Sequence, residues 1–273
     1  MPELPEVETI KSQLQSKILG KTIAKVWIKR DSLVFRDCRE TNYLAEKLKG
    51  KKIKAISRRG KYLLIKLSCE KFLVIHLGMS GNLLIKEHNF KADKHTHLEL
   101  YFKGFKLIFR DPRRFGRVAL IENHNFSGLK GLSELGPEPL SKDFNLRWLT
   151  EKLANRKARI KFLLLDQRIA CGIGNIYSDE ACYLAKISPL KAGGQLSQKQ
   201  LKNLVKAIKK VLKEAIAKVG CTIQDYKTSE GLSGDYKPRV YGRENQRCYR
   251  CRGRIKRIKL GNRSTFYCPV CQN

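Results

Sequence analysis

The chain has 273 residues, 42% of them hydrophobic, and a formal net charge of +32 from 57 Lys and Arg against 25 Asp and Glu. This length fits two domains with real cores, while the lack of a long apolar run and of a basic-then-apolar N-terminus predicts neither a transmembrane helix nor a signal peptide. The basic residues are spread along the whole chain, which favours a polyanionic partner, nucleic acid first and an anionic membrane surface second, over a merely solvated lysine-rich surface.

Helical and then β patterns follow one another along the first half of the chain. Within residues 6–18, Val7, Ile10, Leu14 and Ile18 recur three and four positions apart, which predicts a helix with one buried face. Short β-rich runs separated by turn residues come next, and such a series favours a sandwich or a barrel. The expected strands are residues 22–29, 52–57, 62–67, 72–77, 82–86, 97–102, 105–110 and 117–121.

Helical periodicity dominates the second half. Residues 122–140 are rich in Gly, Pro, Ser and Asn, so we expect a domain boundary near residue 130. The clearest helix is expected over 198–219, where Ser197 and Gln200 form a capping box and Gly220 ends the helix. Its lysines face outward and are interpreted as a solvated face first and a phosphate contact second.

Two loops stand out. SRRGKY (57–62) is a natural hairpin turn, with Gly60 at its tip and Lys61 displayed beside it. SEGLSGDYKP (229–238) contains two glycines and almost no apolar residue, so we expect a mobile loop, or simply a linker to the last segment.

The C-terminus contains two Cys-x2-Cys pairs separated by sixteen residues. Cys248 and Cys251 form the first pair, and Cys268 and Cys271 form the second. This spacing is typical of a four-cysteine zinc site, and because sulfur fills all four positions the single zinc ion is expected to be structural. The remaining cysteines are scattered, and an odd total without a secretion signal favours a reducing cytosol over a disulfide framework. We interpret as structural or incidental Cys38, Cys69, Cys171, Cys182 and Cys221.

The segment between the cysteine pairs alternates apolar and basic residues around a GN turn (261–262), which predicts a hairpin. A metal-pinned hairpin that presents arginines can reach phosphates; the alternative is a zinc ribbon that mediates only protein contacts. Upstream, ACGIGNIYSDEA (170–181) places two glycines and an asparagine before a helix, where exposed backbone N–H groups favour a phosphate. The turn lacks the strand and the third glycine of a dinucleotide fingerprint.

Several stretches, taken together, resemble the formamidopyrimidine-DNA glycosylases, bacterial base-excision enzymes for oxidised purines. They occur in the family's order from the first residue to the last. They are MPELPEVE, RRGKYLL, HLGMSG, DPRRFGR, LGPEPL, LLDQ…GIGNIY, YGRE and RSTFYCPVCQ. The most specific are MPELPEVE and the combination of GIGNIY with the four-cysteine finger.

The resemblance implies an α+β fold with three parts. These are an N-terminal catalytic β-sandwich with a leading helix (1–130), a helical helix–two-turns–helix DNA-binding domain (131–239) and a zinc-finger β-hairpin (240–273). It further implies a monomeric, cytoplasmic bacterial enzyme, associated with the nucleoid through DNA. Its partner would be double-stranded DNA with oxidised purines or abasic sites, bound across the cleft between the halves with the damaged nucleotide flipped out. No membrane partner is expected.

Residue roles are implied by the same resemblance. With Met1 removed, Pro2 has a free secondary amine that can form a Schiff base with the damaged nucleoside. Glu3 matches the general acid that opens the sugar ring, and Glu6 helps to position the amine. Lys61 matches the lysine of base release and β-elimination. Arg263 matches the arginine of δ-elimination, although a guanidinium holds a phosphate better than it donates a proton.

The remaining matched positions contact DNA. Met79, Arg113 and Phe115 match the residues that fill the void left by the flipped base; without the resemblance, core packing would be the simpler interpretation of Met79 and Phe115. The loop at 229–238 matches the segment that closes over the flipped base. Backbone contacts are implied for His95, Arg114, Lys157, Lys161 and Asn175.

The sequence departs from the family's pattern at two positions, and two alternative functions remain. Cys171 replaces a small apolar residue, and Asn82 stands where arginine is more usual, so one DNA contact is expected to be lost. An endonuclease VIII-type glycosylase for oxidised pyrimidines would share the fold, but Leu4 and HLGMSG favour the purine enzyme. A non-catalytic nucleic-acid-binding zinc protein would explain the charge and the cysteines, but not Pro2, Glu3 and Lys61 together.

Overall fold

The structure is a computed structural model that describes residues 1–30, 32–35, 41–122, 126–222 and 226–273, so the interpretation of Cys38 lies outside the described residues. The chain divides into two compact units. Unit 1 comprises Met1–Ser133 and Val219–Asp235, and unit 2 comprises Glu134–Lys218 and Tyr236–Asn273. The chain therefore leaves unit 1, returns to it for one segment, and then completes unit 2. The three-part division given above remains a prediction.

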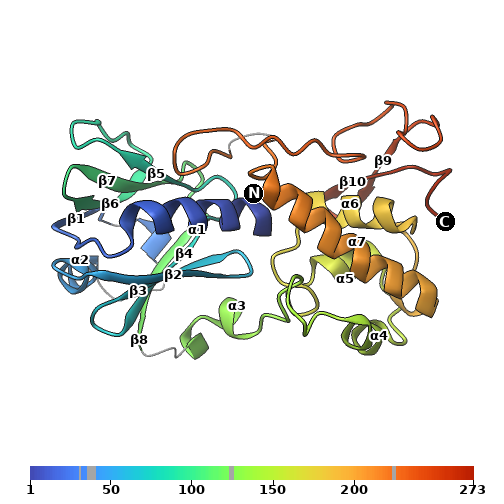
Figure 1. Ribbon diagram of the computed structural model, residues 1–273, viewed down its shortest axis with the longest axis horizontal. Coiled ribbons are helices and arrows are strands. Elements are labelled where there is room, and N and C mark those ends of the chain that lie inside the picture. Colours follow the sequence, from blue (N-terminus) through green and yellow to red (C-terminus); the bar gives the residue numbers. More distant parts are fainter. Residues whose placement is uncertain (31, 36–40, 123–125, 223–225) are drawn as a thin grey trace. The chain divides into compact units, whose positions relative to one another are not determined.

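Unit 1 contains two four-stranded antiparallel sheets (Figure 1). The first has the order β1 (Lys25–Ile28), β6 (Thr96–Phe102), β7 (Phe105–Arg110) and β5 (Asn82–Lys86). The second has the order β2 (Ile53–Arg59), β3 (Tyr62–Leu67), β4 (Lys71–His76) and β8 (Arg117–Glu122). All eight strands expected from the short β-rich runs are present, and the structure confirms the N-terminal β-sheets.

The core of unit 1 explains this arrangement. Helix α1 (Leu4–Ile18) contacts β2 and β3 and buries the predicted apolar face of Val7, Ile10, Leu14 and Ile18. The two sheets and α1 contribute to one hydrophobic cluster, because each strand alternates side chains toward it. The shorter elements of unit 1 are η1 (Leu33–Phe35), α2 (Thr41–Leu48), η2 (Phe126–Gly128) and α3 (Lys130–Ser133).

Unit 2 is helical, apart from its terminal hairpin. Its helices are α4 (Leu146–Leu153), α5 (Ile160–Leu165), α6 (Asn175–Ala185), η3 (Gly193–Gln195) and α7 (Gln198–Ala217). Helix α7 begins with the predicted capping box, in which the Gln200 N–H donates to the Ser197 hydroxyl at 3.3 Å and the Ser197 N–H donates to the Gln200 side chain at 3.1 Å. The exposed lysines of α7 are Lys199, Lys202, Lys206, Lys210 and Lys213.

The C-terminal hairpin pairs β9 (Lys256–Leu260) with β10 (Arg263–Tyr267) around the predicted turn. It lies against α6 and shares with it a small core, which includes Tyr183, Val240 and Ile255. The α+β class with a hairpin finger is thus confirmed. None of the helices in the described ranges is long and apolar enough to cross a lipid bilayer.

Candidate active site and nucleic-acid interface

The first turn of α1 encloses two carboxylates. Pro5 occupies the first helical turn, where a missing N–H leaves no bond unmade, and Glu3 precedes the helix in extended conformation. One oxygen of Glu6 accepts the Glu3 N–H at 2.7 Å, and the other accepts the Cys221 N–H at 2.9 Å. Glu3 and Glu6 are only 2% and 1% exposed, and Pro2 is buried beside them. The helix N-terminus favours negative charge here.

Gly220 fits closely against this turn. Its φ is +85°, and a Cβ on it would lie 2.7 Å from Glu6 Oε1. Both observations favour glycine, because a side chain is strained in the left-handed backbone and would force the buried Glu6 carboxylate to shift. Gly220 was expected only to end α7, which stops three residues earlier at Ala217; its place in the structure is against the N-terminal turn.

The hairpin that contains Lys61 is tied to α1. Arg58 on β2 forms an ion pair with Glu8 of α1 at 2.7 Å and donates to the Gly60 carbonyl at 2.9 Å. Burial acts to raise the pKa of Glu8, but Lys11 and Arg58 outweigh it and hold that pKa below its usual range. Lys61 itself is only 7% exposed, so the expectation that the turn displays it is wrong. The ion pair therefore links the hairpin of Lys61 to the helix that follows Pro2 and Glu3.

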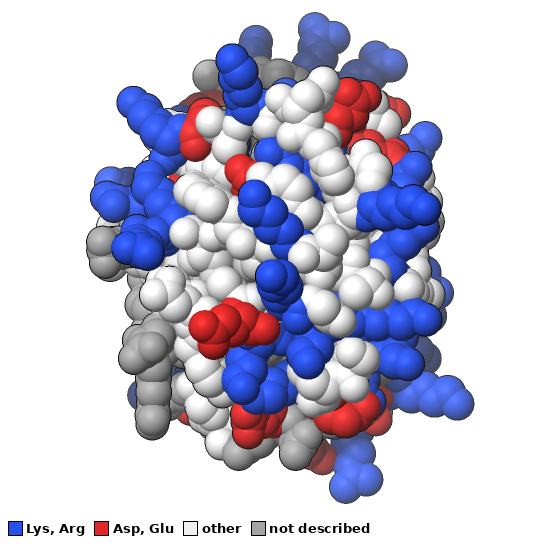
Figure 2. Space-filling view, turned by 90° about the vertical axis from the view of Figure 1, so that its left-hand side faces the viewer, with Lys and Arg blue, Asp and Glu red and all other residues white. Residues whose placement is uncertain are grey.

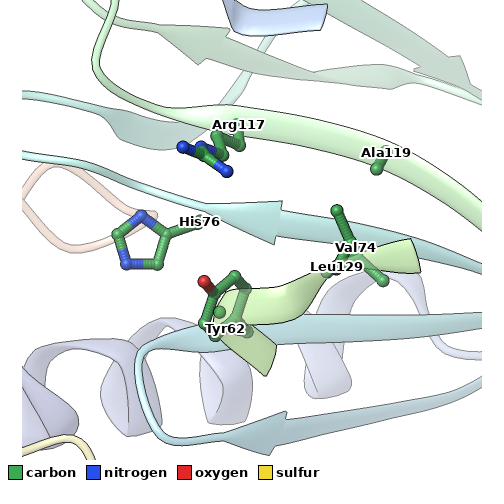
Figure 3. Close-up of a pocket in the computed structure, with 7 residues that line it drawn as sticks. Tyr62, Val74, His76, Arg117, Ala119 and Leu129 are labelled. Atoms are coloured by element: carbon green, nitrogen blue, oxygen red, sulfur yellow. The ribbon is translucent and has the colours of Figure 1, made fainter. Parts of the chain in front are cut away.

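A small pocket adjoins this hairpin on β3, β4 and β8 (Figure 3). The centres of the Tyr62 and His76 rings lie 4.7 Å apart. Arg117 lies next to these rings, because it is the residue of β8 that pairs with His76 of β4 (Figure 3). Nδ1 of His76 accepts the Gly78 N–H at 3.1 Å, so a neutral His76 carries its proton on Nε2 and can donate from there. His76 was not singled out from the sequence, although it is the first residue of HLGMSG.

Two loops bring the expected void-filling residues together. Gly78 has a φ of +63°, and a Cβ on it would lie 2.5 Å from the Gly116 nitrogen, so the backbones of HLGMSG and DPRRFGR touch. Met79 and Phe115 are 44% and 48% exposed, which contradicts the simpler interpretation as core residues. The Arg113 guanidinium lies 4.9 Å from the centre of the Phe115 ring.

Asp111 fixes both loops. Its fully buried carboxylate accepts the Ser80 hydroxyl at 2.6 Å and the Gly116 N–H at 2.7 Å. Its own N–H donates to the carbonyl of His95 at 2.9 Å. His95 is half-buried and Arg114 is exposed, so these two expected DNA contacts flank the same loop. Asp111 was not singled out from the sequence, although it opens the DPRRFGR motif.

The segment expected to be a mobile loop is held against unit 1. The N–H and hydroxyl of Ser229 both donate to Gln13 Oε1, at 2.9 and 2.8 Å, and its carbonyl accepts the Ile85 N–H at 2.9 Å. The side chain of Asn82 accepts the Lys227 N–H at 3.2 Å. Ser229 is fully buried. Ser229, the first residue of the expected loop, is therefore bound to unit 1 through α1 and β5, whereas the expected mobility of the rest of the loop stays a prediction.

The residues of unit 2 that were expected to contact DNA differ in their exposure to solvent. Lys157 is exposed in the loop before α5. Lys161 is fully buried, and its ammonium forms an ion pair with Asp179 and donates to the Asn175 carbonyl at 3.3 Å. In this structure its ammonium is therefore engaged inside unit 2, because Asp179 on α6 supplies a buried counter-charge, and the expected contact with a DNA phosphate stays a prediction.

Asn175 is the first residue of α6, directly after the GIG turn. Its side-chain NH2 donates to the Tyr241 hydroxyl at 3.1 Å and to the Ser264 carbonyl at 3.0 Å. Both donors are thus engaged within unit 2, and a bond from this amide to a phosphate requires one of them to exchange partner. Arg263, next to Ser264, is exposed near the hairpin turn.

The four C-terminal cysteines form the only group of at least three potential metal ligands among the described residues. Their Sγ atoms all lie within 4.8 Å of one another, with 3.5 Å between Cys251 and Cys268 and 3.9 Å between Cys248 and Cys271. A tetrahedron with Zn–S bonds of about 2.3 Å has edges of about 3.8 Å, so the cysteines fit zinc. The Arg250 N–H donates to Cys248 Sγ at 3.4 Å, which supports a thiolate there.

Basic residues also lie on the surface outside the site described above. On the face shown in Figure 2, Lys and Arg are more numerous than Asp and Glu and lie among uncharged residues. The excess is spread over this face rather than gathered in one patch. A face with this excess of positive charge attracts polyanions.

Three family models match the chain in order. Residues 1–118 match the formamidopyrimidine-DNA glycosylase N-terminal domain, residues 135–227 match its H2TH domain, and residues 245–273 match a zinc finger found in FPG and IleRS. The matches confirm the expected helix–two-turns–helix domain and the zinc finger.

Individual relatives agree with the family models over the whole chain. The chain is 41% identical to a formamidopyrimidine-DNA glycosylase of Rickettsia bellii over 285 residues, covering 100% of this chain and 99% of the relative. The chain is 42% identical to a formamidopyrimidine-DNA glycosylase of Chloroflexus aurantiacus over 279 residues, covering 100% of this chain and 98% of the relative.

Solved structures show the same likeness in three dimensions. The MutM (FPG) protein of Thermus thermophilus is 37% identical, with a TM-score of 0.90 and 99% and 98% of the two chains covered. A Lactococcus lactis FPG mutant in complex with DNA containing Fapy-dG is 36% identical, with a TM-score of 0.92 and both chains fully covered. A wild-type Lactococcus lactis FPG in complex with DNA containing an oxidized pyrimidine is 35% identical, with a TM-score of 0.92, and both chains are again fully covered.

Proposed function

The chain belongs to the formamidopyrimidine-DNA glycosylase family, and from this premise we propose that it excises oxidised purines from duplex DNA and then cleaves the strand. It is a DNA glycosylase and AP lyase of base excision repair with one structural zinc ion. Its partner is DNA containing 8-oxoguanine, formamidopyrimidines or abasic sites. The observation that supports this most strongly is the buried turn of Pro2, Glu3 and Glu6, tied to the hairpin of Lys61.

Pro2 is the proposed nucleophile. An α-amino group titrates near pH 8, so about a tenth of it is neutral at pH 7 once Met1 has been removed. The amine lone pair forms a bond to C1′ of the damaged nucleotide, while the bond from C1′ to the base breaks and the base leaves with a proton. The ring oxygen then leaves C1′ and takes a proton from Glu3, which produces an iminium, that is, a Schiff base.

Strand cleavage follows from the iminium. It acidifies C2′, so loss of a proton there expels the 3′ phosphate (β-elimination), and a second elimination expels the 5′ phosphate (δ-elimination). We assign proton transfer in base release and in the first elimination to Lys61. Arg263 assists the second by binding the departing phosphate, because a guanidinium is a good phosphate ligand and a poor acid. Glu6 acts by holding the Glu3 backbone.

Unit 1 also supplies the residues proposed to replace the flipped base. The exposed side chains of Met79 and Phe115 suit insertion into a base step, and Arg113 suits hydrogen bonding to the orphaned base. His95 and Arg114 flank this loop, and Lys157 and Asn175 are the candidates in unit 2; we propose that all four contact the DNA backbone. The segment held by Gln13 and Asn82 is proposed to cover the flipped base.

Oxidised pyrimidines are a second candidate lesion. The Lactococcus lactis FPG structure with an oxidized pyrimidine in its DNA favours testing them. We further propose that the protein is a monomer and that it acts in the bacterial cytoplasm. The relatives named above are bacterial, and the cytoplasm is where a bacterial chromosome and its lesions lie.

Borohydride trapping tests the proposal directly. Borohydride reduces an iminium to a stable bond, so the protein is expected to remain attached to a duplex with one 8-oxoguanine opposite cytosine. Pro2→Gly is expected to lower the rate of trapping strongly while duplex binding persists, because glycine replaces the ring-held secondary amine with a less nucleophilic and less rigidly placed primary amine.

Two further results would change the proposal. Trapping on an oxidised-pyrimidine duplex but not on 8-oxoguanine would reverse the order of the two lesion classes. Trapping that is insensitive to Pro2→Gly and to chemical blocking of the N-terminus would overturn Pro2 as the nucleophile and direct attention to Lys61.

A further inference from the structure

A buried ion pair lies at the centre of unit 2. Lys161 on α5 and Asp179 on α6 pair with each other, and both side chains are completely inaccessible to solvent. Burial raises the pKa of Asp179 to about 7, against the opposing attraction of Lys161. Such pairs seldom stabilise a protein more than apolar residues of the same size would. Stability alone is therefore a weak explanation of this pair.

Each partner has a second contact, and these contacts lead to residues of the proposed site. Lys161 Nζ donates to the carbonyl of Asn175 at 3.3 Å. The second oxygen of Asp179 accepts the Phe266 N–H on β10 at 2.9 Å. Phe266 is three residues from Arg263 on the same strand. The pair thus connects α5, the start of α6 and the zinc hairpin.

The hairpin and the GIGN turn are also joined directly. The Asn175 side chain donates to the carbonyl of Ser264 at 3.0 Å. At the hairpin turn, a Cβ on Gly261 would be within 3.7 Å of the Phe162 ring of α5. The strand that carries the exposed Arg263 is therefore joined to α6 by two hydrogen bonds, of which the Asp179 bond is the more buried.

We propose that Asp179 and Lys161 are positioning residues that hold Asn175 and Arg263 in one arrangement for phosphate binding and δ-elimination. The inference rests on the proposed function, and it gives Lys161 a positioning role that a fully buried side chain can perform. Neither side chain touches DNA; the pair acts through the backbone of Asn175 and of the hairpin. The 3′ cleavage step, which we assign to Lys61 of unit 1, does not require it.

The test uses the zinc-loaded, full-length Asp179→Asn variant. Asparagine keeps an oxygen for the Phe266 N–H but leaves the buried Lys161 ammonium without a counter-charge. On an abasic duplex in single turnover, the share of δ-elimination product is expected to fall several-fold relative to β product. Affinity for a duplex with a tetrahydrofuran abasic analogue is expected to fall roughly tenfold, a typical coupling within a buried network. Borohydride trapping at saturating DNA is expected to persist.

Two further variants separate positioning from stability. Glu99→Gln breaks another nearly buried ion pair, with Lys106 in unit 1, and is expected to leave the product ratio unchanged. The double variant Lys161→Met with Asp179→Leu removes both buried charges, so it is expected to recover stability while the product ratio stays altered.

The outcomes are distinct. A wild-type product ratio and affinity in Asp179→Asn, or a ratio that recovers together with stability in the double variant, would overturn the positioning role. Absence of a trapped complex in the wild-type protein would instead overturn the proposed function. In that case the affinity measurement still decides whether the pair positions a DNA-binding surface.

Discussion

Glu6 shows how one residue can connect the N-terminus to a distant segment. Its two carboxylate oxygens accept N–H groups from Glu3 and from Cys221, residues that are more than two hundred positions apart. The carboxylate is buried and lies 2.7 Å from where a Cβ of Gly220 would be. The carboxylate therefore fixes the direction in which the chain leaves Pro2.

Glu6→Gln tests this connection. One of the two N–H donors would then face an amide NH2, and a buried donor without an acceptor costs about 1–3 kcal/mol. We expect a lower free energy of unfolding by that amount and a slower trapping rate on 8-oxoguanine DNA. Calorimetry and single-turnover trapping measure the two effects. Glu46→Gln, on the exposed surface of α2, is the matched control; equal effects of both substitutions would exclude the proposed connection.

Elements differ in how well local patterns predict them. Strands β3, β4 and β7 have apolar runs bounded by turns, so these strands were predictable from the sequence. Helix α7 was predictable because it has an apolar stripe and a capping box. The fixed position of Ser229 was not predictable, because Gln13 and Ile85 are far away in sequence. The burial of Lys161 was equally hidden, since a lysine in a short helix is normally exposed and only the tertiary contact with Asp179 favours the inside.

The zinc hairpin is the element whose stability depends most on a ligand. It has few apolar residues of its own, and a four-cysteine zinc site contributes about 10 kcal/mol or more of folding free energy. We expect Cys248→Ser to lose stoichiometric zinc and to weaken DNA binding at least tenfold, because Arg263 loses its support. Metal analysis and DNA titration measure this. Cys69→Ser in unit 1 is expected to keep both properties, and full affinity without metal would remove the hairpin from the binding surface.

At the scale of the whole molecule, the number of phosphates that the protein neutralises sets the dependence of DNA binding on salt, and the charge of +32 provides many basic residues for such contacts. Each neutralised phosphate releases counterions, so six or more phosphate contacts weaken binding by about 10³-fold between 50 and 200 mM salt. We expect a loss of that size for an undamaged duplex. Lys157→Gln is expected to reduce the slope of log affinity against log salt by about one, whereas Lys202→Gln on α7 leaves it unchanged. Equal slopes for all three proteins would contradict the assignment of Lys157.

The return of residues 219–235 to unit 1 has a consequence for synthesis. The ribosome releases Met1–Ser133 roughly 100 residues before it releases the segment that bonds to Glu6, Gln13 and Asn82. At about 5–20 residues per second, the nascent sheets wait for about 5–20 s before this segment can join them. The turn of Pro2 therefore acquires its final surroundings late in translation, after most of unit 2 has been made.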